Sequence, residues 1–278
     1  MAALSGRTFC ITGANTGIGR DTALDLARRG GRLILLGRSL DRTQSVLDEI
    51  AAIGEPAAFV PCDLGDLDSV RGAADAVIAL DEPIHVLINN AGLAGQRGTT
   101  AQGFELAFGT NHLGHFALTT RLLDVLRASA GPTPSRVVCV SSDSHYAPKS
   151  LDLDAVRQPT KSVTGMAEYG VSKLANVLFA QELARREDPA VVTTYALHPG
   201  VIASDIWRKV PWPVRPIVTR FMRSTEEGAQ TTLYCATDPA LAAETGGFYS
   251  DCASKEPSDV ATPAAGAELW RRSEEWTA

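Results

Sequence analysis

Short, continuously apolar runs alternate with amphipathic stretches over the first 200 residues of the chain. The apolar runs are rich in Val, Ile and Leu and predict strands at 7–12, 32–36, 57–60, 85–88, 136–140 and 191–197. Between them, apolar positions at helical spacing predict helices at 17–29, 40–52, 67–79, about 100–129 and 168–186. Strands that are apolar on both faces and alternate with helices are typical of a parallel, doubly wound α/β sheet with helices on both faces.

No low-complexity linker or internal repeat interrupts this alternation. A length of 278 residues would allow two domains, but the continuity of the pattern predicts a single domain over residues 1–278. The stretch at about 202–225 departs from the pattern because it carries large apolar side chains around three prolines, Pro211, Pro213 and Pro216. It predicts a small lid over a substrate, and packing of the same side chains onto the core or onto another subunit is the alternative.

Composition narrows the class of protein. The chain is 45% hydrophobic and has 26 basic against 32 acidic residues, and no run of Lys and Arg predicts binding to nucleic acid. No apolar stretch reaches the roughly 18 residues of a membrane span, and no hydrophobic signal region precedes the first strand, so we expect a cytoplasmic protein without a membrane anchor.

The five cysteines are scattered without a CxxC pair, which predicts reduced packing residues. His112 and His115 have no carboxylate or thiolate companions nearby, so we expect no metal.

A glycine-rich turn joins the first predicted strand to the first predicted helix, with the sequence Thr12-Gly13-Ala14-Asn15-Thr16-Gly17-Ile18-Gly19. Glycines let the backbone turn tightly and approach a pyrophosphate, whose charge is favoured by the N–H groups at the helix N-terminus. The spacing departs from GxGxxG. The turn therefore predicts a dinucleotide site, and a tight strand–helix connection without a ligand is the alternative.

Arg38 follows the second predicted strand, where dinucleotide-binding folds usually place the residue that meets the adenosine ribose. A carboxylate there binds the 2′-hydroxyl of NAD, whereas a guanidinium suits the 2′-phosphate of NADP. No carboxylate precedes Asp41, so the sequence favours NADP(H), with NAD(H) still possible and a solvated loop cation as the alternative.

Tyr169 and Lys173 are four residues apart at the start of a predicted helix and therefore share one face. A phenol has a pKa of about 10, and a nearby ammonium stabilises its phenolate form. The pair predicts acid/base chemistry, and a hydroxyl from Ser141-Ser142, just after a predicted strand, is placed to hold a substrate oxygen. A YxxxK spacing alone also occurs by chance in structural helices.

Five motifs occur in order: the glycine-rich turn, Asn89-Asn90-Ala91-Gly92, Val140-Ser141-Ser142, Tyr169-Gly170-Val171-Ser172-Lys173 and His198-Pro199-Gly200. In combination they resemble the short-chain dehydrogenase/reductase family over about residues 5–277. Within it, the chain is similar to the retinol-dehydrogenase-like and WW-domain-oxidoreductase-like group through the segments Asn111–Phe116, Ser172–Val177, Phe248–Cys252 and Leu269-Trp270. The resemblance implies a Rossmann fold with a mostly parallel seven-stranded sheet.

The same resemblance implies roles for individual residues. Tyr169 would be the catalytic acid/base, and Lys173 would lower its pKa and hold the nicotinamide ribose. Ser142, rather than Ser141 or Ser144, would polarise the carbonyl. Asn111, in a helix interrupted near Gly114, would hold a water that relays protons to Lys173. The cofactor would contact Tyr169 and Lys173 together with Gly13, Asn15, Thr16, Gly17, Ile18, Gly19, Arg38, Asp63, Leu64, Asn90, Ala91, Gly92, Pro199, Gly200, Ile202 and Ser204.

The resulting expectation is an NADP(H)-dependent reductase of a bulky, hydrophobic ketone or aldehyde. Oxidation of a retinol-like or steroid-like alcohol is the reverse alternative. Two other classes stay open: a non-catalytic protein that senses NADP(H), and a nucleotide-sugar epimerase or dehydratase. Family members often pair through the helices that carry Asn111 and Tyr169, so a homodimer or homotetramer is possible.

Overall fold

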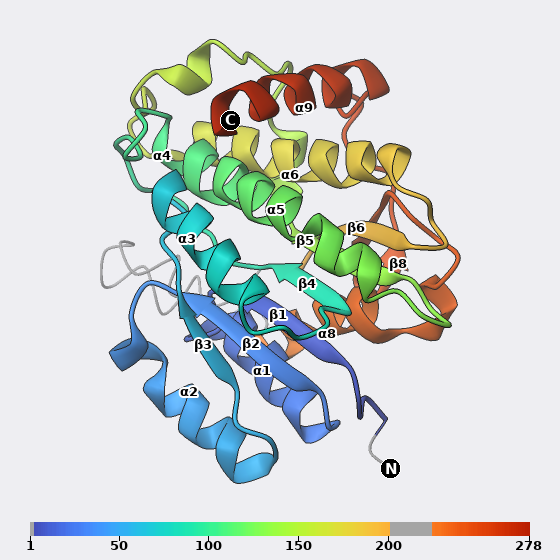
Figure 1. The fold of residues 1–278 in the computed structure, drawn as a ribbon. Coiled ribbons are helices and arrows are strands. Elements are labelled where there is room, and N and C mark those ends of the chain that lie inside the picture. Colours follow the sequence, from blue (N-terminus) through green and yellow to red (C-terminus); the bar gives the residue numbers. More distant parts are fainter. Residues whose placement is uncertain (1–2, 201–223) are drawn as a thin grey trace.

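An eight-stranded sheet forms the centre of the protein in the computed structural model, which describes residues 3–200 and 224–278. The strand order is β3-β2-β1-β4-β5-β6-β7-β8, and all neighbours pair in parallel except β7 and β8. Helices cover both faces (Figure 1). The doubly wound α/β fold is therefore confirmed.

The described elements follow the predicted alternation. The strands are β1 (Thr8–Thr12), β2 (Arg32–Gly37), β3 (Ala58–Pro61), β4 (Val86–Asn89), β5 (Ser135–Val140), β6 (Val192–His198), β7 (Gly247–Ser250) and β8 (Ala253–Ser254). The α-helices are α1 (Gly17–Arg28), α2 (Leu40–Ile53), α3 (Leu67–Ile78), α4 (Leu106–Phe108), α5 (Gly114–Ala128), α6 (Met166–Arg186), α8 (Thr225–Thr237) and α9 (Pro263–Thr277). Short helical turns are η1 (Gly109–Leu113), η2 (Asp143–Tyr146), η3 (Ala155–Arg157) and η5 (Pro239–Leu241).

The sheet has one strand more than the seven expected. The extra strand, β8, is two residues long and returns antiparallel to β7. The connecting residues Asp251 and Cys252 both have left-handed φ angles, 53° and 56°. Two successive left-handed residues make the tight hairpin turn that reverses a twisted strand, and neither is the glycine that usually signals such a turn in a sequence.

The single long helix expected at about 100–129 is wrong at its start. Gly103 has a φ of 77°, and the chain becomes helical only at α4, where the Glu105 side chain accepts a hydrogen bond from the Phe108 N–H at 2.8 Å. A five-residue π-helix, η1, then separates α4 from α5. A Cβ atom on Gly114 would lie 2.4 Å from the Leu64 carbonyl oxygen, so the glycine lets the widened turn pack closely against the loop after β3.

Side chains alternate between two hydrophobic cores, one on each face of the sheet. In β1, Phe9 and Ile11 belong to one core and Cys10, between them, belongs to the other. Helices α1, α2 and α8 cover the first face, whereas α3, α5 and α6 cover the second, with α9 packed outside α6 (Figure 1). Burial on both faces explains why the strands are continuously apolar.

The strand order reverses at β1, which lies between β2 and β4. In open α/β sheets, ligands bind beyond the carboxyl ends of the strands at such a reversal, because the loops there diverge to opposite faces. The turns after β1 and β4 begin at this edge, so the fold places the glycine-rich turn and the Asn90-Ala91-Gly92 segment side by side.

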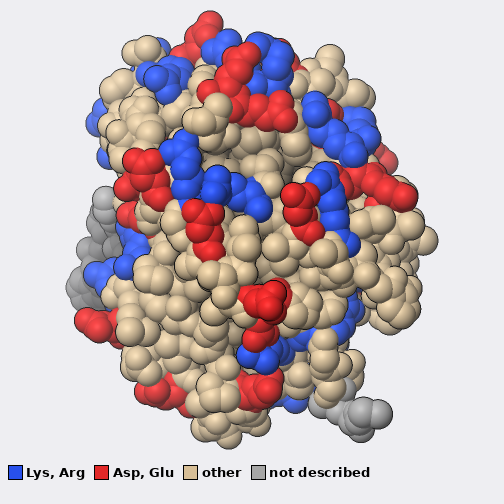
Figure 2. All heavy atoms as spheres, in the orientation of Figure 1, with Lys and Arg blue, Asp and Glu red and all other residues tan. Residues whose placement is uncertain are grey.

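Acidic and basic side chains are interspersed on the face shown in Figure 2. Several form exposed ion pairs, such as Arg121 with Asp75 and Arg71 with Asp68. Pairs of this kind contribute about 0–1 kcal/mol each, so the fold depends mainly on its two cores. No helix in the described part of the chain combines the length and apolar character needed to cross a membrane.

Helix α9 packs against α5 and α6 through aromatic side chains. The Trp270 ring lies 5.0 Å from that of Phe116 and 5.8 Å from that of Phe179, measured between centroids. The Arg186 guanidinium lies 4.5 Å above the same indole, and Trp270 is buried. The indole N–H has no hydrogen-bond partner within residues 3–200 and 224–278, so this contact is one of packing.

We expect Trp270→Ala to lower the free energy of unfolding by about 3–5 kcal/mol, because it leaves a cavity among aromatic rings. Denaturant-induced unfolding followed by circular dichroism measures the change. Arg271→Ala on the exposed face of the same helix removes only surface ion pairs to Glu268 and Glu275 and should cost about 1 kcal/mol or less. Equal losses in the two variants would contradict the packing role of Trp270.

Candidate active site

The turn after β1 presents an open, uncapped helix N-terminus. Thr16 occupies the N-cap of α1, but its side chain makes no capping hydrogen bond. Gly17 has a φ of 59°, and among the described residues a Cβ there would meet only the Thr225 methyl, at 4.0 Å. Backbone N–H groups without internal partners at the positive end of a 12-residue helix fit the phosphates of a dinucleotide.

Asn90 and Ala91 hold this turn from the neighbouring strand. The Asn90 side-chain amide donates to the carbonyl oxygens of Thr12, at 2.8 Å, and Gly13, at 3.2 Å. The Thr12 hydroxyl accepts from the backbone N–H groups of Asn90 and Ala91, both at 3.0 Å. A Cβ on Gly19 would lie 2.4 Å from the Asn90 amide, so glycine is needed for this close approach.

The ends of β2 and β3 carry the residues expected at the adenosine end of the cofactor. Arg38 is exposed and directly precedes Ser39, whose hydroxyl caps α2 by accepting from the Arg42 N–H at 3.3 Å. Among the residues that the structure describes, Arg38 has no ion-pair partner. After β3, Asp63 accepts from the Gly65 N–H at 2.9 Å, and Leu64 is buried.

Lys173 is buried beneath the cleft. Its Nζ donates to the Val140 carbonyl oxygen at 2.8 Å and lies 5.6 Å from the centroid of the Tyr169 ring. A Cβ on Gly92 would lie 3.4 Å from this nitrogen, so the segment after β4 passes directly over it. Burial lowers the pKa of the Lys173 ammonium to about 8 because the charged form has lost its water.

The pKa of the buried Tyr169 hydroxyl lies above its ordinary value in the protein by itself. Burial raises this pKa, and the nearby Ser142 side chain lowers it by a smaller amount. Lys173 Nζ bonds to the Val140 carbonyl oxygen, and a lowering of the Tyr169 pKa by Lys173 together with a bound cationic nicotinamide stays a prediction. At neutral pH Tyr169 is a protonated phenol that can donate a proton.

The two adjacent serines have separate partners. Ser141 is buried, and its hydroxyl donates to the Lys173 carbonyl oxygen at 2.7 Å. Ser142 is half-buried, and its hydroxyl donates to the Ser144 hydroxyl at 3.3 Å and accepts from the Ser144 N–H at 3.2 Å. The Ser142 side chain, rather than that of Ser141, lies close enough to Tyr169 to lower the pKa of the phenol.

Asn111 lies in the π-helix η1 and is fully buried. Its amide nitrogen donates to the Leu93 carbonyl oxygen at 3.0 Å and to the Ser172 hydroxyl at 2.9 Å, while its amide oxygen accepts from the Leu93 N–H at 2.9 Å. The side chain therefore joins the loop after β4 to α6 beside Lys173. A water relay through Asn111 stays a prediction.

His115 is a member of the site that the sequence did not reveal. Its Nδ1 bonds to the Asn111 carbonyl oxygen at 2.8 Å and its Nε2 to the Thr12 hydroxyl at 2.9 Å. A carbonyl can only accept, so Nδ1 carries the hydrogen and Nε2 accepts from Thr12. Burial lowers the pKa of His115 to about 4, which keeps the ring neutral. In the sequence, His112 and His115 stand out only as a pair without carboxylate or thiolate companions. In the structure, His112 meets the Ser273 hydroxyl at 3.1 Å.

Several predicted positions lie at or beyond the limits of the described residues. Pro199 and Gly200 follow β6 at the cleft edge of the sheet. Ile202, Ser204 and all of the predicted lid up to residue 223 lie outside the described residues. Four of the five cysteines are buried free thiols, and Cys252 is an exposed one.

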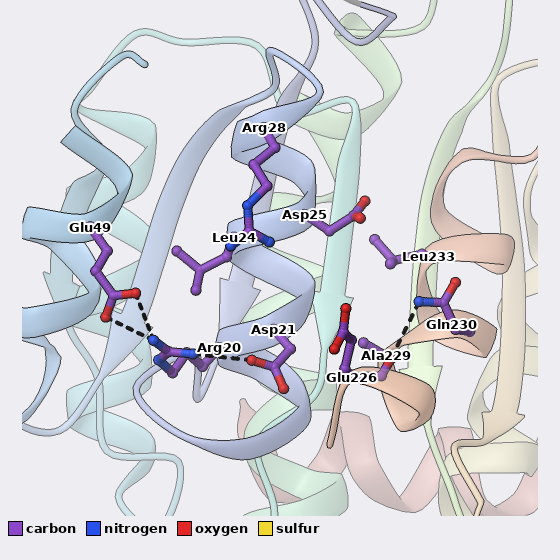
Figure 3. Close-up of a pocket in the computed structure, with 10 residues that line it drawn as sticks. All are labelled: Arg20, Asp21, Leu24, Asp25, Arg28, Glu49, Glu226, Ala229, Gln230 and Leu233. Carbon is purple, nitrogen blue, oxygen red and sulfur yellow. Dashed lines mark hydrogen bonds and ion pairs between the residues drawn. The ribbon is translucent and has the colours of Figure 1, made fainter. Parts of the chain in front are cut away.

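A cavity of about 240 Å³ opens elsewhere, between α1, α2 and α8 (Figure 3). Charged side chains of both signs line it, and Arg20 is held there by both carboxylate oxygens of Glu49, at 2.6 and 2.8 Å. None of the predicted site residues contributes to its wall. This cavity is therefore separate from the cleft that contains Tyr169.

The fold and the cleft together define a class of enzyme. A phosphate-binding turn at the reversal of a parallel sheet, beside buried Tyr, Lys and Ser side chains, is the arrangement of a nicotinamide-dependent oxidoreductase. The family model described as short chain dehydrogenase matches residues 7–151. The chain belongs to the short-chain dehydrogenase/reductase family, in its retinol-dehydrogenase-like group.

Individual relatives agree with this assignment. Retinol dehydrogenase 12 of Mus musculus is 42% identical over 257 residues, which cover 90% of this chain and 79% of the relative. Retinol dehydrogenase 13 of Homo sapiens is 39% identical over 271 residues, covering 94% and 81%. The crystal structure of an uncharacterized protein from Mycobacterium paratuberculosis superposes with a TM-score of 0.77 at 33% identity and covers 98% of this chain and 94% of that one.

We expect kcat/KM for the nicotinamide cofactor to fall as the pH rises through about 8. A lysine is charged below its pKa and neutral above it, so Lys173 loses its charge in this range. Rates measured between about pH 6 and about pH 10 report the groups of the free enzyme. Lys173→Arg, which stays cationic, should show lower activity without this alkaline decrease. A decrease at the same pH in both proteins would rule out Lys173 as its cause.

Proposed function

We propose that the protein interconverts a bulky, hydrophobic carbonyl compound and its alcohol with NADP(H), and that it works chiefly as a reductase. The observation that carries this proposal is the position of the Ser142 side chain beside the buried Tyr169, close enough to lower the pKa of the phenol, with the buried Lys173 Nζ 5.6 Å from the centroid of the same ring. Two neighbouring hydroxyl groups of this kind can hold one substrate oxygen between them.

Ser142, Tyr169 and Lys173 each have a separate role in the proposed reaction. A nicotinamide bound in this cleft would supply the hydride for reduction or accept it in oxidation. Ser142 donates a hydrogen bond to the carbonyl oxygen, and Tyr169 gives that oxygen its proton. The raised pKa of Tyr169 keeps the proton on the phenol at neutral pH, so the residue can donate it during reduction. The Lys173 ammonium stabilises the phenolate that remains.

Arg38 supports the choice of NADP(H). It is an exposed guanidinium at the carboxyl end of β2, without an ion-pair partner in the described chain, and it stands where a carboxylate would select NAD. A guanidinium binds a phosphate with two parallel hydrogen bonds.

The substrate class rests on the relatives and on the apolar composition of residues 202–225. The relatives are named as retinol dehydrogenases, and retinol is a hydrophobic alcohol. These names favour a second candidate function, oxidation of a retinol-like alcohol by the same residues in reverse. A cytoplasmic location and a homodimer or homotetramer stay predictions.

We expect Tyr169→Phe to lower turnover by about 10²-fold or more, because the proton donor is lost, and to leave cofactor affinity nearly unchanged. The assay follows nicotinamide absorbance with a panel of hydrophobic carbonyls and alcohols and with both cofactors. Tyr234→Phe on α8, outside the cleft, is the matched control. Full turnover by Tyr169→Phe would refute the mechanism, and binding without turnover in the unaltered protein would favour a sensor.

We expect Arg38→Asp to shift the ratio of kcat/KM for NADPH over NADH at least about tenfold toward NADH. Charge-assisted hydrogen bonds are worth about 1.5–3 kcal/mol, and 1.4 kcal/mol is a factor of ten. Arg121→Asp introduces the same charge change on α5 and should leave the ratio as it was. An unchanged ratio in Arg38→Asp would show that other residues select the cofactor.

A further inference from the structure

Two histidine rings hold the peptide group that follows Ser142. The Ser142 carbonyl oxygen accepts from His145 twice, from Nδ1 at 2.7 Å and from the backbone N–H at 3.0 Å. On the other side of the same peptide group, the Asp143 N–H donates to His198 Nδ1 at 3.2 Å. The peptide plane beside Ser142 is thus fixed by contacts at both its oxygen and its nitrogen.

His145 is itself held from the C-terminal part of the chain. The Ser258 N–H donates to His145 Nε2 at 3.1 Å. Because a backbone N–H can only donate, Nε2 is the acceptor, and Nδ1 carries the hydrogen that reaches Ser142. The ring is fully buried, and its centroid lies 3.9 Å from that of Tyr146 and 4.5 Å from that of Phe248.

Residues 255–258, here called the C-terminal strap, touch the same turn at two more points. The Lys255 ammonium pairs with the Asp143 carboxylate at 3.2 Å, and the Tyr146 hydroxyl donates to the Glu256 carbonyl oxygen at 2.5 Å. The strap is anchored at its start, because the Lys255 N–H donates to the Phe248 carbonyl oxygen of β7 at 2.8 Å. The strap therefore moves with the edge of the sheet.

The three contacts between the C-terminal strap and the turn after Ser142 differ in burial and therefore in how firmly they hold the turn. The pairs of Lys255 and Tyr146 are exposed, and exposed ion pairs add about 0–1 kcal/mol of stability. The contact through His145 is buried and ends on the peptide group of Ser142 itself. A buried bond whose removal leaves donors unpaired is costly to break, so it holds a defined geometry.

We propose that His145 is a positioning residue that links the C-terminal strap to Ser142 and so keeps the Ser142 side chain in place beside Tyr169. This inference rests on the role of Ser142 in the proposed function. A displacement of about 1 Å in a reacting group can cost about 10²-fold in rate, so a rigid support for the Ser142 hydroxyl is a rate determinant.

The test combines two substitutions that break the link at different places. His145→Phe keeps an aromatic ring between Tyr146 and Phe248 but loses both hydrogen bonds. Ser258→Pro removes the donor N–H, fixes the backbone φ angle and loses the hydroxyl that accepts from the Val260 N–H. Ser258→Ala loses the same hydroxyl but retains the N–H, and serves as the matched control. His145→Asn, whose amide nitrogen can still reach Ser142 but offers Ser258 no ring acceptor, replaces His145→Phe if that variant does not fold.

We expect His145→Phe to lower kcat at least about tenfold with cofactor KM unchanged, and Ser258→Pro to lower kcat in the same direction. Because both changes break one link, the double variant should be no slower than the slower single variant. The proposal would be overturned if the losses of the two single variants multiplied in the double variant. It would also be overturned if His145→Phe kept a kcat within about twofold of the unaltered protein, or if Ser258→Ala lost as much kcat as Ser258→Pro.

Hydrogen exchange separates this inference from the proposed function. Mass spectrometry of peptides that span residues 142–146 should show faster amide exchange in His145→Phe and Ser258→Pro than in Ser258→Ala. If the unaltered protein turned over none of the substrates, the proposed function would be refuted, but the hydrogen-exchange comparison would still test the link between the strap and Ser142. Equal exchange in all three variants would overturn the link between the strap and Ser142.

Discussion

The hydrogen bonds of the Thr12 hydroxyl join the parts on which the cleft depends. This one oxygen accepts from the backbone of Asn90 and Ala91 and bonds to His115, whose other nitrogen holds the Asn111 carbonyl. The turn after β1, the end of β4 and the π-helix η1 are thereby one unit. Parallel pairing makes this possible, because it brings the carboxyl ends of neighbouring strands to the same edge.

Burial sets the electrostatics of this unit. Removal from water disfavours charge, so it lowers the pKa of Lys173 and raises that of Tyr169. The same effect keeps His115 neutral, which lets one ring nitrogen donate while the other accepts. The result is a group of buried side chains in which the phenol keeps its proton and the pKa of Lys173 lies at about 8, which suits the delivery of a proton to a substrate oxygen.

The end of the chain supports the same cleft from outside. The strap reaches the turn that carries Ser142, and α9 packs against α6, the helix of Tyr169 and Lys173. Near the end of α9, Ser273 meets His112 of the π-helix, and the Trp276 ring lies 5.3 Å from that of Phe104. Residues 255–277 thus contact three separate segments that carry candidate catalytic side chains, which ties the stability of the C-terminus to the geometry of the site.

Local rules were enough to predict the parallel sheet, the turn after β1 and the shared face of Tyr169 and Lys173, because periodicity and glycine stereochemistry act over a few residues. These local rules failed where contacts between distant segments determine the backbone conformation. The left-handed Asp251 and Cys252 that create β8 carry no glycine signal, and the break before α5 depends on close contact with the loop after β3.

The sequence by itself determined the alternation of strands and helices and the motifs that follow the strands, since hydrophobic period and glycine stereochemistry act locally. Only the tertiary structure decided the protonation and the partners of the side chains in these motifs. Burial raises the pKa of Tyr169 and lowers that of Lys173. Likewise, the hydrogen bond between His145 and Ser258 joins residues 113 positions apart, and no local pattern can indicate a contact made only when the chain has folded.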